Sequence, residues 1–353
     1  MLLAPVVSHG GTEDKLPAPV FSQDLRQYGL KTETIDSSLT ASYNQVVFLT
    51  DDIVLVAINQ RTLTQPAEPA DVDQPAARLL FFDIKRRVLI RTVEMPLEKD
   101  SDTVQPLSGA RFAIRNESGI TICDLDSVCG QPIKVSQGPL LASPRGTAFV
   151  AGGHGQTEQV LFDSATEKPL GRFPWENPVV VPGDGSSLLR YHNNSTLFTK
   201  RVGQPDQALQ ATEALDIFLP AARFISNSTV AVNKSVETLL VVQVSGTALY
   251  QVPVHPWYRG TSVVTSAGGL RFGIRESDFT SWNSITHFYD IEKTRPYDLE
   301  KIRVLEVESG KALFEIERDP RPYTQRLTLP ALSPDGHHLA TIYRGFLEVY
   351  EIP

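Results

Sequence analysis

Short stretches in which apolar and polar residues alternate follow one another along most of this chain of 353 residues. Alternation with a period of two is typical of β-strands that bury one face, because successive side chains point to opposite sides of a strand. Polar and glycine-containing turns separate these stretches, and no stretch has the helical period of an amphipathic helix. The pattern therefore predicts an all-β fold.

One short motif recurs seven times along the chain. It consists of two or three apolar residues, a small residue that is polar in six of the seven copies, a tight turn and an alternating strand. The small residue falls at positions 50, 108, 143, 182, 226, 266 and 333, so the spacings are 58, 35, 39, 44, 40 and 67 residues. Removing two long polar insertions, 60–77 and 277–300, brings every spacing to between 35 and 44. This length is typical of one four-stranded blade of a β-propeller, about 40–45 residues.

Most units continue with a strand that ends in an acidic residue, then a turn and another strand; the acidic residues are Asp83, Asp124, Asp163 and Glu306. These units and the segment Ser-Pro-Asp-Gly-His-His-Leu-Ala at 333–340 resemble WD-repeat-like and YVTN-type β-propellers. The Trp-Asp pair of true WD repeats is replaced by Phe-Asp, Cys-Asp or Tyr-Glu. The resemblance implies the fold and says little about function, because one fold hosts many functions. We predict a single seven-bladed β-propeller over residues 17–353, after a flexible lead-in over residues 1–16.

The seventh unit supplies only three strands, around 329–332, 339–343 and 346–352, which would leave an unpaired sheet edge where the ring closes. Leu30 to Ile35, just upstream of the first unit, alternate as a strand does. We predict that this N-terminal strand pairs with residues 346–352 and completes the last blade, which joins both ends of the chain in one sheet.

Composition and charge narrow the classes of partner. Lys plus Arg number 33 and Asp plus Glu 41, and the net charge of −8 argues against broad nucleic-acid binding. No apolar run approaches the roughly 20 residues that span a bilayer, so we predict no membrane span. The apolar run 1–7 is shorter than the core of a signal peptide. The protein is then either cytoplasmic or extracytoplasmic with its leader removed, and we favour the second interpretation.

The two cysteines, Cys123 and Cys129, lie in a predicted hairpin with five residues between them. They could form a small disulfide in an oxidising compartment. Alternatively, Cys123 is a buried thiol on a strand and Cys129 an unrelated thiol at a turn. Two cysteines without histidines at ligand spacing do not make a zinc site.

One face of the propeller is predicted to carry the binding residues. In each blade, the connection from the second to the third strand and the link to the next blade open on the same side, which we call the loop-rich face. Both insertions and all three tryptophans fall on such connections. The predicted ligand-binding residues are Trp175, Trp257, Tyr258, Arg259, Trp282, Arg295, Arg321 and Tyr323. Trp and Arg often dominate interface energies, so we expect a protein, peptide or glycan to bind there. The alternative is that Trp175 and Trp257 wedge between blades while the second insertion packs on its own aromatic residues.

Motifs of enzyme chemistry are missing from the sequence. It contains no Gly-x-Ser-x-Gly, no phosphate-binding glycine loop, no His-Glu-x-x-His and no Cys-x-x-Cys, and we predict no cofactor and no metal. We therefore expect a non-catalytic binding or interaction scaffold. The alternative is a propeller enzyme, either a lactonase-like hydrolase or a quinone- or metal-dependent oxidoreductase, whose residues converge at the central channel. Three or more His, Asp or Glu side chains at the mouth of that channel would distinguish the two.

Overall fold

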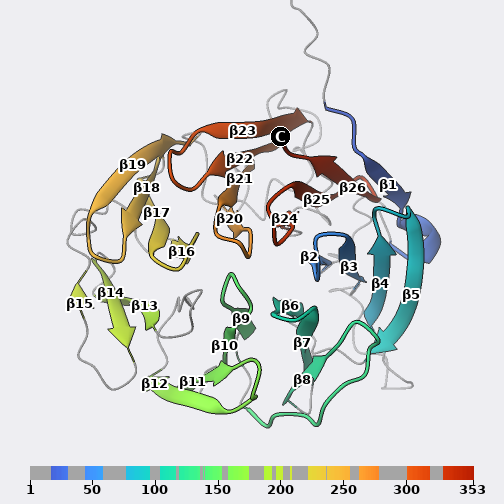
Figure 1. Cartoon of the computed structure of the whole chain (residues 1–353), viewed down its shortest axis with the longest axis horizontal. Helices are drawn as coiled ribbons and strands as arrows, with labels where there is room; N and C mark the ends of the chain where they lie inside the picture. The colour runs from blue at the N-terminus through green and yellow to red at the C-terminus, as the bar shows by residue number, and fades with distance from the viewer. Residues whose placement is uncertain are drawn as a thin grey trace, which may run out of the picture.

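Seven β-sheets surround a common axis in the computed structural model of the protein (Figure 1). Structure is described for residues 17–30, 44–58, 77–95, 104–116, 119–135, 138, 140–152, 158–174, 187–192, 196–201, 207–208, 222–235, 237–254, 262–277, 300–318 and 329–353. Within these ranges the only helix is the single-turn 3₁₀ helix η1 (Arg26–Tyr28), and no helix is long and apolar enough to cross a membrane. The predicted all-β propeller is confirmed.

The sheets are antiparallel, and we number them one to seven in the chain order of their first described strands, with N-terminal β1 assigned to sheet seven. Five sheets have four described strands each. Sheet one consists of β2 (Gln45–Phe48), β3 (Ile53–Ile58), β4 (Ala77–Asp83) and β5 (Val88–Met95), and sheet three of β9 (Leu140–Ala142), β10 (Ala148–Ala151), β11 (Glu158–Asp163) and β12 (Pro169–Pro174). Sheet five consists of β16 (Ala222–Phe224), β17 (Thr229–Ser235), β18 (Thr238–Gln243) and β19 (Ala248–Pro253), sheet six of β20 (Ser262–Thr265), β21 (Arg271–Ser277), β22 (Glu300–Glu306) and β23 (Ala312–Arg318), and sheet seven of β24 (Ala331–Leu332), β25 (His338–Tyr343), β26 (Phe346–Glu351) and β1 (Phe21–Asp24). Two sheets have three: β6 (Val104–Leu107), β7 (Arg111–Asn116) and β8 (Gly119–Cys123) in sheet two; β13 (Ser187–His192), β14 (Thr196–Arg201) and β15 (Gln207–Ala208) in sheet four.

The number of blades differs from the prediction. A geometric count assigns six blades rather than seven, although seven separate sheets are present. Sheets two and four each have three described strands, and sheet four has none on the axial side of β13. The copy of the recurring motif that would supply this strand, around Pro182, lies outside the described residues. The predicted count of seven is therefore not confirmed.

The recurring small polar residue caps the turn that follows the first strand of a sheet. In four sheets its hydroxyl accepts a hydrogen bond from a backbone N–H after the turn: Thr50 from Ile53, Ser143 from Ala148, Ser266 from Arg271 and Ser333 from His338. The acidic residue at the end of the third strand likewise caps the turn that connects the third strand to the fourth. The Asp163 carboxylate accepts from the backbone N–H and the hydroxyl of Thr166, and these bonds lower the pKa of Asp163. Such short-range bonds explain why these positions are Ser, Thr or Asp.

The ring is closed by β1 and not by the segment that we predicted. Phe21 lies opposite Val349, and Asp24 opposite Phe346, in an antiparallel pairing of β1 with β26. An N-terminal strand thus completes the last sheet, as expected, but the assignment to Leu30 to Ile35 is wrong. Leu30 is buried in the core shared by sheets one and seven, and residues 31–35 lie outside the described ones. The edge of β26 is already occupied by β1, so no place remains there for a second strand.

Removing β1 is expected to destabilise the whole domain. Deletion of residues 1–24 takes away the buried Phe21 ring, which lies 5.9 Å from the Phe82 ring, and exposes the edge of β26. Burial of one such side chain contributes roughly 1.5–3 kcal/mol, and an open ring also loses cooperativity. Urea unfolding should therefore show a loss of at least about 3 kcal/mol. Deletion of residues 1–15 should leave the midpoint unchanged, and equal midpoints for the two deletions would contradict the assignment.

Cys123 and Cys129 are joined by a disulfide in sheet two. The segment after β8 forms no regular strand in its described part, and it pairs with β8 at two isolated bridges, Ile120 with Ile133 and Cys123 with Cys129. The Gly130 N–H donates to the Ile122 carbonyl at 2.9 Å. The disulfide therefore fastens an irregular outer segment to the sheet.

Replacing both cysteines with serine is expected to release that segment without unfolding the sheet. The loop closed by the disulfide is short, so the loss of stability should be about 2 kcal/mol. Amide hydrogen exchange at Gly130 and Ile133, whose N–H groups bond across to β8, should become faster than exchange within β7. Dithiothreitol should reproduce the effect in the natural protein and change nothing in the double variant.

Tyr250 ties sheet five to sheet six and makes stability sensitive to high pH. Its hydroxyl donates to the Val307 carbonyl at 2.7 Å, and burial, with a smaller effect of Glu306, raises the pKa of Tyr250 to about 12. An unfolded tyrosine has a pKa of about 10. The contribution is thus complete below pH 10 and is lost as the pH rises from about 10 to 12. Unfolding free energies measured across this range should fall less steeply for Tyr250→Phe than for the natural protein; identical slopes would refute the assignment.

Candidate functional site

The eight residues predicted to bind a ligand lie outside the described residues: Trp175, Trp257, Tyr258, Arg259, Trp282, Arg295, Arg321 and Tyr323. Their grouping on one face therefore stays a prediction. The strand ends that border two of these segments are described, and they lie side by side: Ser277 of β21 is opposite Glu300 of β22, which is opposite Arg318 of β23. The second insertion and the link 319–328 are thus both attached at the same end of the strands of sheet six.

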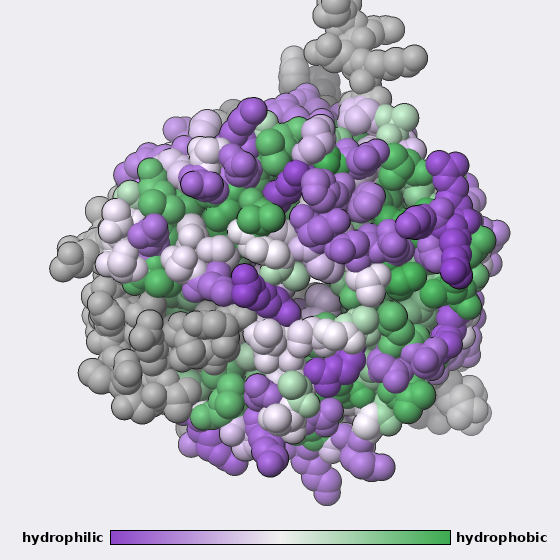
Figure 2. Space-filling view, viewed as in Figure 1, coloured by the Kyte–Doolittle hydropathy of each residue, from purple (hydrophilic) through white to green (hydrophobic). Residues whose placement is uncertain are grey.

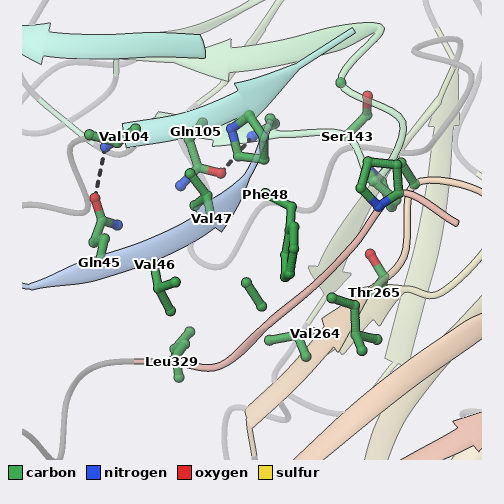
Figure 3. Close-up of a pocket in the computed structure, with 18 of the residues that line it drawn as sticks. Gln45, Val46, Val47, Phe48, Val104, Gln105, Ser143, Val264, Thr265 and Leu329 are labelled. Carbon is green, nitrogen blue, oxygen red and sulfur yellow. Dashed lines mark hydrogen bonds between the residues drawn. The ribbon is translucent and has the colours of Figure 1, made fainter. Parts of the chain in front are cut away.

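The first strands of six sheets enclose a cavity on the axis of the ring, with a volume of about 260 Å³ (Figure 3). Much of its wall is apolar and is formed by residues such as Val47, Pro106, Leu141, Val264 and Leu329. The surface is hollowed near the middle of the ring, where residues of mixed hydropathy meet (Figure 2). The cavity is thus open to solvent and offers apolar surface to a ligand.

Polar side chains in the cavity wall come from several sheets. They are the amides of Asn44, Gln45 and Gln105, the hydroxyls of Ser143 and Thr265, and the guanidinium groups of Arg145 and Arg223. The described lining contains no histidine, cysteine, aspartate or glutamate. Elsewhere in the described part of the chain, no group of three such residues is arranged to hold a metal ion. The described wall therefore combines apolar surface with amide, hydroxyl and guanidinium groups.

Two glutamines connect neighbouring strands around the cavity. Gln45 Oε1 accepts a hydrogen bond from the Val104 N–H at 2.8 Å, and Gln105 Oε1 accepts from the Ala142 N–H at 3.4 Å (Figure 3). A backbone N–H bonds only to an acceptor, so these contacts determine which end of each amide is the oxygen. The Nε2 ends of both amides are therefore turned away from these N–H groups.

A second cluster of polar groups lies where sheet six meets sheet seven, at the strand ends below the second insertion. Glu300 is 1 % exposed, and its two oxygens bind Arg275 Nε at 2.6 Å and Arg318 Nε at 3.3 Å. Arg318 continues into sheet seven, where it donates to Glu348 Oε2 at 2.8 Å and to Thr341 Oγ1 at 3.0 Å. On the opposite face of sheet six, toward sheet five, a separate pair joins Arg303 to Glu276, and Arg303 also donates to the Pro253 carbonyl at 2.7 Å. We call Arg275, Glu300, Arg318 and Glu348 the buried ion network; its two positive and two negative charges balance.

An aromatic ring borders the network. The guanidinium carbon of Arg318 lies 4.0 Å from the centre of the Tyr343 ring, and that of Arg344 lies 5.4 Å from the same ring. Tyr343 ends β25, and Arg344 forms the tight turn before β26 with a positive φ of 47°. Arginine over a tyrosine face is a favourable cation–π arrangement. Arginine and aromatic groups thus lie together at this edge of the described structure.

Comparison with known proteins finds no family model and no curated protein that matches this chain. The structure supports the propeller fold, whereas the resemblance to WD-repeat-like and YVTN-type families is not confirmed.

Sequence analysis did not identify the buried ion network, although one signal was present. The pattern Arg-Phe-x-Ile-Arg occurs twice, at 111–115 and at 271–275. The second arginine of each copy, Arg115 or Arg275, follows buried apolar residues on a strand and is itself only 1 % or 3 % exposed. Arginine is almost never buried without a partner. The repeated pattern therefore indicates a buried ionic contact near the end of the second strand.

Proposed function

We propose that this protein is a non-catalytic binding or interaction scaffold that holds a protein, peptide or glycan on its loop-rich face. The observation that carries the proposal is the buried ion network at the base of the second insertion and of the link 319–328. Glu300 connects the ends of β21, β22 and β23, and Arg318 connects them to sheet seven.

The energetics of buried charges suggest that the buried ion network positions the strand ends rather than adding to the stability of the fold. Removing charged groups from water costs so much that well-packed apolar residues often stabilise a fold equally well. What the network supplies in addition is a defined geometry at strand ends from which two long connections leave. Binding residues usually lie on loops that a rigid scaffold holds in place. The network therefore supports a binding role for these connections.

The kinds of side chain at this edge favour a macromolecular partner. Arg318, Tyr343 and Arg344 combine cationic and aromatic surface. Arginine and aromatic residues are enriched among the side chains that dominate protein interfaces. The tryptophans and arginines predicted on the neighbouring connections belong to the same classes.

We further infer that the ring has seven blades and is related to WD-repeat-like and YVTN-type propellers. The motif around Pro182 would place a strand on the axial side of β13 and give sheet four the same order as the others. A high-resolution crystal structure without a strand there would refute the seventh blade.

Intrinsic fluorescence provides a direct test of the binding face, because all three tryptophans of the chain are predicted to lie on it. Peptides selected from a phage-displayed library on the full chain should change this fluorescence on titration. Trp282→Ala should weaken their binding by about 2 kcal/mol or more and leave thermal unfolding unchanged.

The matched control is Leu270→Ala, at a side chain that is 65 % exposed in a turn on the opposite face of sheet six. This variant should bind the selected peptides as the natural protein does. Peptides that lose affinity for Leu270→Ala but not for Trp282→Ala would refute the proposed face. Unfolding of Trp282→Ala would show that the tryptophan belongs to the core.

A further inference from the structure

The described lining of the axial cavity carries charge opposite in sign to that of the whole protein. The chain carries a net charge of −8, yet the only charged side chains in the described lining are Arg145 and Arg223. Arg223, on β16, is exposed and lines the cavity. Low-dielectric walls concentrate the field of such charges inside a cleft. The described lining therefore favours anions over cations.

Hydrogen-bond donors in the wall add to this preference. The Gln105 oxygen is occupied by the Ala142 N–H, so its Nε2 group offers donors rather than acceptors. A guanidinium carries five N–H donors, which lets Arg223 bind a ligand as well as a partner within the protein. An ionised carboxylate accepts hydrogen bonds and donates none, and arginine binds it in a two-pronged geometry. The described polar groups therefore match a carboxylate better than a cation.

The remaining surface of the cavity sets the size and character of the ligand. Val47, Pro106, Leu141 and Val264 form apolar wall, and the volume of about 260 Å³ is close to the lower end for small-molecule sites, roughly 300–1,000 Å³. We propose that the axial cavity is a binding site for a small carboxylate with an apolar body. The site lies on the axis and takes a small molecule, so it stands independently of the proposed macromolecular partner.

Isothermal titration of the full chain with hexanoate, acetate and 1-hexanol tests the proposal. Hexanoate carries both the charge and the apolar body, whereas acetate lacks the body and hexanol lacks the charge. Saturable binding of hexanoate, at least about tenfold tighter than either of the others, is expected, because a hydrogen bond to a charged group contributes roughly 1.5–3 kcal/mol, a factor of ten or more.

Variants locate the site. Arg223→Gln should weaken hexanoate binding about tenfold or more, and Arg223→Lys should retain most of it because the charge is kept. Arg145→Gln provides a second test at the exposed turn that lines the cavity. Arg172→Gln is the control, since Arg172 lies on the outer strand β12 beside Glu158. Thermal unfolding of all four variants checks that each is folded at the temperature of the titration.

Several outcomes would overturn the proposal. These are the absence of saturable hexanoate binding at millimolar concentration, equal affinities for hexanoate and hexanol, or unchanged hexanoate affinity in both Arg223→Gln and Arg145→Gln. A loss of affinity in Arg172→Gln equal to that in Arg223→Gln would place the binding elsewhere and would overturn it as well.

Discussion

Gly146→Ala is expected to lower the free energy of unfolding by about 2–5 kcal/mol. Gly146 has a φ of +64°, which costs an alanine about 1–2 kcal/mol. A Cβ there would lie 2.5 Å from Leu107 Cα and from the backbone nitrogen of Ser108. The Ser108 N–H also donates to the Gly146 carbonyl at 2.9 Å. The clash would therefore push apart two sheets where their backbones touch, and backbone atoms move aside less easily than a flexible side chain.

Gly109→Ala is the matched control for this substitution. Gly109 also has a positive φ, of +75°, but the nearest atom to an added Cβ is Arg111 Nε at 3.8 Å. Gly109→Ala should lower the free energy of unfolding only by the cost of a positive φ for alanine, about 1–2 kcal/mol. Urea unfolding of both variants separates the clash from the backbone strain. Equal losses for the two would show that the contact between sheets two and three gives way easily.

The contacts that sequence analysis could anticipate act over a few residues. The Ser143 hydroxyl bonds the Ala148 N–H, and the Asp163 carboxylate bonds Thr166. Because each bond joins residues within one turn, it leaves a small polar or acidic residue at a regular spacing. That spacing, together with the alternation of apolar residues, is why the propeller could be predicted without any family relationship.

The closing strand was misplaced because its partner is far away in the sequence. β1 needs little more than Phe21 on its buried side to pair with β26, and its short sequence Phe-Ser-Gln-Asp is mostly polar. The alternation at 30–35 is a stronger local signal. To choose between β1 and the segment 30–35, one must know which of them reaches the free edge of β26. Local periodicity does not carry this information.

The candidate sites were hidden for a similar reason. The axial cavity takes one or a few side chains from each of six sheets, so Gln45, Gln105 and Arg223 become neighbours of one cavity only when the ring closes. The buried ion network spans Arg275 to Glu348 and includes two sheets. Residue type alone indicates a buried arginine, but its partners follow only from the register of the strands.

Glu300→Gln is expected to cost about 3–5 kcal/mol, because it breaks a buried network by removing the charge of one partner. The Glu300 carboxylate is 1 % exposed and binds both Arg275 and Arg318, whose side chains are each 4 % exposed. Glutamine has nearly the same shape, so the change removes charge and creates almost no cavity. Its amide nitrogen would also face a guanidinium donor, which leaves two buried cations with less compensation.

Glu158→Gln removes the same charge from an exposed ion pair and serves as the control for Glu300→Gln. Glu158 and Arg172 are 3.3 Å apart, with side chains 54 % and 68 % exposed, and water screens such pairs to about 0–1 kcal/mol. Chemical denaturation should therefore place the two variants at least about 2 kcal/mol apart. If Glu300→Gln unfolds at the same denaturant concentration as Glu158→Gln, the network does not hold the ends of β21, β22 and β23 together. The connections above it would then lack the rigid base on which the proposed binding face depends.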